Sequence, residues 1–127
     1  MTVFAVAVGG AFGAVARYGV SIWMMQQFGG GFPWGTLAVN LVGCFLLGLL
    51  DGFVVSGQLV SAEARLLLGT GFLGALTTFS TFSVETIRAF EVGQWLVAGG
   101  YLAVSLIGGL ALAALGVTLA TKIAVGG

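Results

Sequence analysis

Glycines and hydroxyl side chains are concentrated in one apolar stretch of the chain, residues 69–86, where three glycines precede six serines and threonines. Gly74 and the neighbouring residues Thr77 and Thr78 favour a local opening in the hydrogen-bond ladder of a helix. Freed backbone groups are tolerated at membrane depth only where they are buried in protein or line a cavity. Freed carbonyl oxygens can bind a cation, and a freed helix N-terminus favours an anion. The stretch therefore predicts a membrane helix that is broken near its centre and carries an ion site.

Helical spacing places the polar residues of this segment on one face, at positions i, i+4, i+8 and i+11: Thr77, Thr81, Glu85 and Arg88. Phe79 and Phe82, three residues apart, share a neighbouring face. A phenyl ring has a positive edge, so it can contact an anion without carrying a formal charge. The alternative is that the hydroxyls bond to helix carbonyls and that both phenylalanines are core residues. For the cluster as a whole, with Glu85 at its end, the functional interpretation is preferred.

Polar residues are rare in the other apolar runs, and each has two interpretations. Arg17 is either a cation that attracts anions into a vestibule or an arginine that reaches toward the membrane interface. Asn40 can donate two hydrogen bonds to a ligand or join two helices. Tyr101, Ser105 and Gly109 form an i, i+4 stripe that adds hydroxyl donors to an otherwise apolar helix.

The composition is that of an integral membrane protein. Of 127 residues, 59% are hydrophobic and only 6% are charged, whereas soluble domains carry about 25% charged residues. The net charge is zero, so nothing suggests a nucleic-acid-binding patch. Histidine is absent and Cys44 is the single cysteine, so a metal site built from side chains and an enzymatic function are not expected. Cys44 is interpreted as a small packing residue.

The elements that position these residues are four membrane spans, because a membrane helix needs about 20 mostly apolar residues. We expect an all-α fold with one four-helix transmembrane domain over residues 1–127 and spans at about 3–25, 33–55, 64–90 and 95–121. Tryptophan favours the membrane interface. Trp23, Trp34 and Trp95 all fall at the boundary where the first and third connections lie, in agreement with this count.

The basic residues give no clear orientation. Arg65 and Lys122 belong to one side of the predicted bundle, Arg88 to the other, and Arg17 lies within a span. Basic residues in cytoplasmic loops normally set the topology. Either the orientation signal is hidden, or the chain inserts both ways and pairs with an inverted copy.

Most of the 23 glycines lie inside the predicted spans. Gly9 with Gly13, and Gly48 with Gly52, form GxxxG pairs, which allow close contact between membrane helices. This predicts tight packing and oligomerisation, but it does not distinguish a channel from a transporter.

Three motifs resemble the Fluc/CrcB family of fluoride channels. They are Gly-Ala-Val-Ala-Arg-Tyr at 13–18, Pro-Trp-Gly-Thr-Leu-Ala-Val-Asn-Leu-Val-Gly at 33–43, and Gly-Ala-Leu-Thr-Thr-Phe-Ser-Thr-Phe-Ser at 74–83, followed by Glu85 and Thr86. The motifs occur in the family's order and the resemblance covers nearly the whole chain. It implies an antiparallel, dual-topology homodimer in the lipid bilayer with two fluoride pathways.

The resemblance also implies roles for single residues. Phe79 and Phe82 would contact fluoride through their ring edges, and Asn40 would donate hydrogen bonds in the pore. The other members of the pathway would be Ser80, Thr81, Glu85, Tyr101 and Ser105. Arg17 would line the vestibule, and the backbone carbonyls of Gly74 and Thr77 from both subunits would bind a structural sodium ion.

The implied function is a passive, fluoride-selective channel of the bacterial inner membrane that lets fluoride leave the cytoplasm down its electrochemical gradient. Two alternatives remain. A proton-coupled exporter like the small multidrug transporters needs a carboxylate in its first span, where this chain has only Arg17. A packing subunit of a larger membrane complex would move no ion alone.

Overall fold

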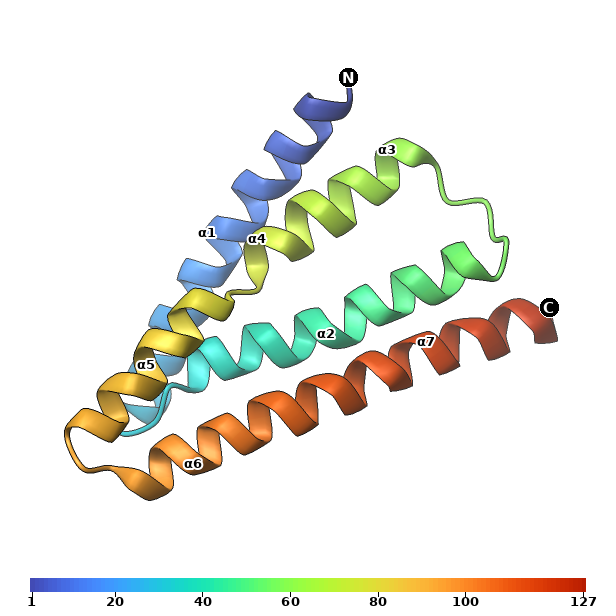
Figure 1. The fold of residues 1–127 in the computed structure, drawn as a ribbon. Helices are drawn as coiled ribbons and strands as arrows, with labels where there is room; N and C mark the ends of the chain where they lie inside the picture. Colours follow the sequence, from blue (N-terminus) through green and yellow to red (C-terminus); the bar gives the residue numbers. More distant parts are fainter.

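The computed structural model describes residues 1–127 as an all-helical chain (Figure 1). Four helical spans are long and apolar enough to cross a membrane: Thr2–Phe28, Trp34–Val55, Ala62–Glu91 and Trp95–Gly126. The predicted all-α architecture with four spans is therefore confirmed. Both termini lie away from the end of the bundle that holds the turn between α5 and α6 (Figure 1).

The first two spans are single helices, α1 (Thr2–Phe28) and α2 (Trp34–Val55), whereas the third is divided. It consists of α3 (Ala62–Ala64), the π-helical segment η1 (Arg65–Leu73), α4 (Gly74–Leu76) and α5 (Phe79–Glu91). Thr77 and Thr78 separate α4 from α5 with extended backbone, at φ −82° and ψ 153° for Thr77 and φ −152° and ψ 110° for Thr78. Gly74 keeps helical dihedral angles, so the extended residues are the two threonines alone.

The fourth span begins as α6 (Trp95–Ala103), passes through a second π-helical segment η2 (Val104–Gly108) and ends as α7 (Gly109–Gly126). A sharp turn joins α5 to α6, and Gly93 provides its positive φ of 77°. This turn brings Tyr101 in α6 back against the residues of α5.

The spans pack in two pairs, α1 against η1 and α2 along α7 (Figure 1). Glycine makes both contacts possible, because a Cβ atom on Gly9 or Gly13 would overlap backbone carbonyl oxygens of Leu67 or Phe72. A Cβ on Gly48 would likewise overlap the carbonyl oxygen of Ala113. The close packing predicted from the glycine pairs is therefore present within one chain.

Gly116 gives a direct test of this packing. A methyl group at this position would overlap the carbonyl oxygen of Phe45 and lie 2.7 Å from the Leu49 nitrogen. We expect Gly116→Ala to lower the free energy of unfolding by about 1–3 kcal/mol, because α2 and α7 must move apart. Gly19→Ala is the control: nothing lies within 4 Å of its added Cβ, and alanine favours a helix over glycine by about 1 kcal/mol. Denaturant unfolding in detergent measures both, and equal effects would contradict this account of the α2–α7 contact.

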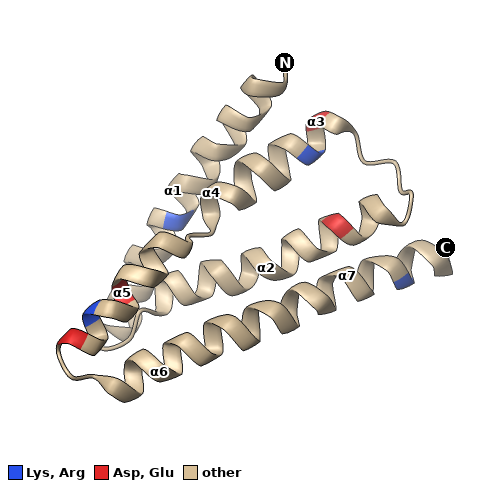
Figure 2. Cartoon of the chain, in the orientation of Figure 1, with Lys and Arg blue, Asp and Glu red and all other residues tan.

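Charged residues gather toward the ends of the bundle, with one basic residue midway along α1 (Figure 2). The only charge in α1 is Arg17, which is partly exposed. Figure 2 also shows acidic and basic residues together on α5, where the sequence places Glu85, Arg88 and Glu91.

Candidate anion site

Asn40 anchors the extended residues between α4 and α5. Its amide Nδ2 donates to the Thr78 carbonyl oxygen at 3.1 Å, and the Thr78 N–H donates to Asn40 Oδ1 at 2.7 Å. Gly43, one turn after Asn40, leaves room for the methyl group of Thr77, which a Cβ atom there would overlap. The amide therefore holds two helices together, as one interpretation proposed. It also retains an N–H that makes no hydrogen bond within the chain.

These contacts redirect two backbone donors. The Thr78 N–H turns to Asn40 and so does not donate to the carbonyl of Gly74, four residues earlier. The Thr81 N–H donates to Thr78 Oγ1 at 3.2 Å, as in an N-cap, and so does not donate to the carbonyl of Thr77. Both carbonyl oxygens thereby lose their normal helical partners and can bind a ligand.

Phe79, Phe82 and Asn40 line one cavity of about 250 Å³ together with Cys44 and Ser105. The two rings lie 5.7 Å apart between centroids and are tilted by 52°. Phe82 is buried, whereas Phe79 is 75% exposed in the single chain. The Ser105 hydroxyl oxygen is buried and has no hydrogen-bond partner. An amide side chain, an unpartnered hydroxyl group and two phenyl rings thus belong to the residues that line one cavity, which we call the anion cavity.

Glu85 lies on the next turns of α5 and accepts two hydrogen bonds. Thr36 Oγ1 donates to Oε1 and the Tyr101 hydroxyl donates to Oε2, each at 2.8 Å. Tyr101 is fully buried. Its ring makes an edge-to-face contact with Phe82, with centroids 5.0 Å apart and an interplanar angle of 76°. The second span, α5 and α6 therefore meet at this carboxylate.

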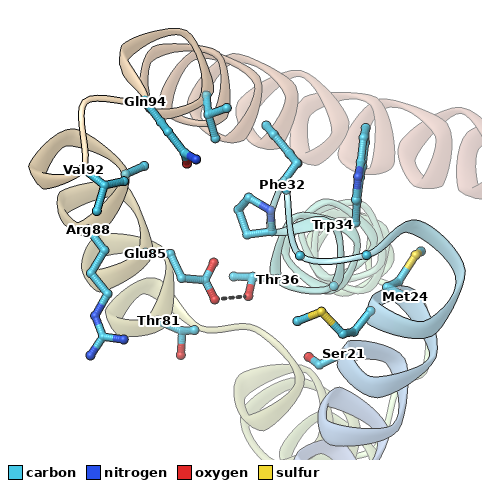
Figure 3. A pocket seen from close by; sticks show the side chains of 18 residues that line it. Ser21, Met24, Phe32, Trp34, Thr36, Thr81, Glu85, Arg88, Val92 and Gln94 are labelled. Atoms are coloured by element: carbon cyan, nitrogen blue, oxygen red, sulfur yellow. Dashed lines mark hydrogen bonds between the residues drawn. The ribbon is translucent and has the colours of Figure 1, made fainter.

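A second cavity of about 530 Å³, the vestibule, opens beside Glu85 (Figure 3). Thr36, Thr81, Glu85 and Arg88 line it, together with the Phe32–Trp34 connection and residues of α1. Figure 3 shows the Thr36 hydroxyl pointing at Glu85 and the Arg88 side chain extending away from that carboxylate. The vestibule thus combines an acceptor group with a separate cation.

The structure brings most of the predicted residues to these two cavities, but with different contacts from those expected. The helical face predicted from Thr77 to Arg88 is interrupted, because Thr77 is extended, donates to the Leu73 carbonyl and lines the anion cavity. Thr81, Glu85 and Arg88 lie in the continuous helix α5 and line the vestibule together, so the predicted face is kept for these three residues. The extended backbone at Thr77 and Thr78 takes only Thr77 out of that face.

The remaining predicted residues lie at the edges of this arrangement. Ser80 is exposed, and its hydroxyl oxygen lies 3.4 Å from Thr78 Oγ1. Arg17, Gly74 and Tyr101 line neither the anion cavity nor the vestibule, and the Tyr101 hydroxyl reaches the site only through its hydrogen bond to Glu85. Sequence reasoning assigned no role to Thr36, although it lies four residues before Asn40 on the same face of α2 and could have been found by that spacing.

Comparison with known proteins places the chain in a family. The model of the CrcB family, described as "CrcB-like protein, Camphor Resistance (CrcB)", matches residues 4–117. The chain belongs to the CrcB family. It is 52% identical to a Rhizobium etli protein over 109 residues, 86% of each chain, and 42% identical to a Sorangium cellulosum protein over 123 residues, 97% of each. A Chloroflexus aurantiacus relative is 44% identical over 117 residues, 92% of this chain and 93% of the relative.

All three CrcB relatives bear the name "Fluoride-specific ion channel FluC". The resemblance noted from the motifs is therefore confirmed over most of the chain. Family membership, together with four apolar spans, makes the chain a multi-pass membrane protein. An ion channel is not an enzyme, and the relatives' name indicates no catalytic function.

Proposed function

We propose that this CrcB-family protein is a passive, fluoride-selective channel of the bacterial inner membrane that lets fluoride leave the cytoplasm down its electrochemical gradient. The observation that carries the proposal is the buried, unpartnered Ser105 hydroxyl in the cavity that Asn40, Phe79 and Phe82 line. The name of the relatives supports fluoride as the ion.

The chemistry of the anion cavity suits a small, strongly hydrated anion. Hydrogen-bond donors from Ser105 and Asn40 replace water around the ion, and the positive ring edges of Phe79 and Phe82 add attraction. No Lys or Arg lines this cavity. That favours conduction, which needs binding strong enough for the ion to enter and weak enough for it to leave.

We place the fluoride route from the vestibule, beside Glu85, to the anion cavity. Thr36 and Tyr101 both donate to the carboxylate. Thr36 lines the vestibule, so an entering fluoride competes with Glu85 for the Thr36 hydroxyl. Thr81 lines the vestibule and Thr78 lines the anion cavity, and the Thr78 hydroxyl donates to the Thr81 hydroxyl. Together with Ser80, which lies beside Thr78, these hydroxyls form a polar track between the two cavities. Glu85 thus positions hydroxyl donors at the outer end of the pathway.

The complete channel is proposed to be an antiparallel, dual-topology homodimer. In the single chain Phe79 is 75% exposed although the proposal gives its ring a specific role, which supports coverage by a second copy. In such a dimer the break of the third span carries four carbonyl oxygens without helical partners, those of Gly74 and Thr77 from each subunit. Arg17, which lines neither cavity of one chain, is proposed to reach a vestibule formed by both subunits.

We propose that these carbonyl oxygens of Gly74 and Thr77 bind a structural sodium ion, because hard cations prefer oxygen ligands and the chain offers no cluster of acidic, cysteine or histidine side chains. Bound there, the ion would supply fixed positive charge at the break of the third span. The Asn40–Thr78 and Thr78–Thr81 hydrogen bonds hold this segment in its extended conformation.

Tyr101→Phe tests whether the Tyr101 hydroxyl contributes to fluoride passage, because the substitution keeps the aromatic ring in the core. The ring contacts with Phe82 and Phe32 remain, while the hydroxyl that donates to Glu85 is lost. We expect fluoride efflux from liposomes to fall about fivefold, the effect of a lost hydrogen bond worth about 1 kcal/mol. Unchanged efflux from well-folded Tyr101→Phe protein would remove the hydroxyl from the pathway.

Two other functions make different predictions for the same liposomes. A proton-coupled exporter needs a proton gradient, and the first span of this chain holds no carboxylate that could carry the proton. A packing subunit moves no fluoride when it is the only protein present. Voltage-driven fluoride efflux at equal pH on both sides excludes both.

A further inference from the structure

One face of α2 passes along three cavities, the vestibule, the anion cavity and a smaller third cavity. Residues at helical spacing make up this face: Thr36, Asn40, Cys44, Leu47 and Asp51. Thr36 lines the vestibule, and the next three line the anion cavity. Leu47 and Asp51, with Arg65, line a third cavity of about 130 Å³. Leu47 lines both the anion cavity and the third cavity, so the row of cavities along α2 extends past Phe79 and Phe82.

Cys44 occupies the middle of this series. It is partly buried, one turn after Asn40, and it lines the anion cavity. On the facing span, a Cβ atom at Gly109 would lie 3.3 Å from Cys44 Sγ, so the glycine leaves space for the thiol. Ser105, one turn before Gly109, lines the same cavity, and its hydroxyl is buried and unpartnered. The thiol therefore packs against Gly109 of the facing span, and the same side chain lines the anion cavity.

We propose that the fluoride route continues along α2 beyond Asn40, and that the Cys44 side chain lines its wall between the phenylalanine pair and the third cavity at Asp51 and Arg65. This inference rests on the proposed function. A thiol is small and only a weak hydrogen-bond donor. Such a group suits a position where the ion must pass without being held.

The chain provides its own probe, because Cys44 is its only cysteine. Methyl methanethiosulfonate replaces the thiol proton with an S–CH₃ group and releases methanesulfinate, which enlarges the side chain by one methylthio group. We expect modified wild-type protein in liposomes to lose fluoride efflux by about tenfold or more, as a narrowed pathway raises the barrier to passage. Cys44→Ala protein has no thiol, so whatever its own rate before treatment, that rate should be the same afterwards. Mass spectrometry establishes that the thiol has reacted.

A matched control moves the thiol to another face of the same helix. Val42 is 52% exposed and lines none of the three cavities. In the Cys44→Ala background, Val42→Cys should conduct equally well with and without the reagent. Full fluoride efflux from protein whose Cys44 is modified, or a Cys44 thiol that does not react in the folded protein, would overturn the inference while leaving the proposed function intact. Absence of efflux from untreated protein would instead remove the proposed function and this inference with it.

Discussion

Phe79→Ile is expected to reduce fluoride efflux by about tenfold or more, which corresponds to losing about 1.4 kcal/mol of stabilisation at the barrier. Isoleucine keeps an apolar side chain of similar size but has no positively polarised ring edge. Phe79 is 75% exposed in the single chain. Its replacement therefore removes little packing within the subunit, and the variant is expected to fold.

Phe82→Ile should cause a similar loss of efflux but with a measurable effect on stability. Phe82 is buried and packs edge-on against Tyr101. Losing this aromatic pair is expected to lower the free energy of unfolding by about 1 kcal/mol. The two variants together separate the effect on conduction from the effect on folding.

Efflux of both variants is measured in liposomes at equal protein density, with unfolding in detergent measured alongside. Leu102→Ile, a change on the exposed side of α6, is the control for adding a β-branched residue near the site. Wild-type rates in Phe79→Ile would show that its ring edge has no role, and the same result in Phe82→Ile would reduce that residue to core packing.

Asn40→Leu is expected to abolish measurable fluoride efflux, a loss of about a hundredfold or more. The substitution removes the donor to the anion cavity. It also leaves the Thr78 N–H and carbonyl without their partners, at a cost of about 1–3 kcal/mol for each unpaired group. With that anchor lost, the N–H of Thr78 is free to return to the Gly74 carbonyl. The extended conformation at Thr77 and Thr78 is then no longer enforced.

Stability measurements show whether Asn40 acts in this way. Unfolding in detergent should reveal a loss of about 2–5 kcal/mol in Asn40→Leu. Thr118→Val provides the comparison, because it removes an exposed hydroxyl that bonds only to the Ala114 carbonyl of its own helix. It should change stability by about 0.5 kcal/mol or less. An Asn40→Leu protein as stable and as conductive as wild type would contradict both roles of the amide.

The four spans were predictable because hydrophobicity and length alone determine them, as Trp34–Val55 shows. The π-helical segments were not, because nothing in the residues of Val104–Gly108 distinguishes a π-turn from an α-turn. Those segments shift the angular position of later residues, and helical-face arguments cannot follow such a shift.

The residues of the candidate site could be predicted from the sequence better than the contacts that they make with one another. Asn40, Phe82 and Ser105 were identified from residue type within apolar runs, and they line one cavity. The bond from Tyr101 to Glu85 joins residues 16 positions apart across the turn at Gly93, and that from Thr36 to Glu85 spans 49 positions. Such partners depend on how spans pack, which local periodicity does not encode.

Voltage-driven efflux from liposomes that contain only this purified protein is the most direct test of the central claim. Fluoride and chloride are compared in matched vesicles at equal pH inside and outside, with the membrane potential set by a potassium gradient and an ionophore. The account predicts rapid fluoride efflux that needs no proton gradient, with chloride retained. Equal efflux of the two anions, or no fluoride efflux from folded protein, would contradict it.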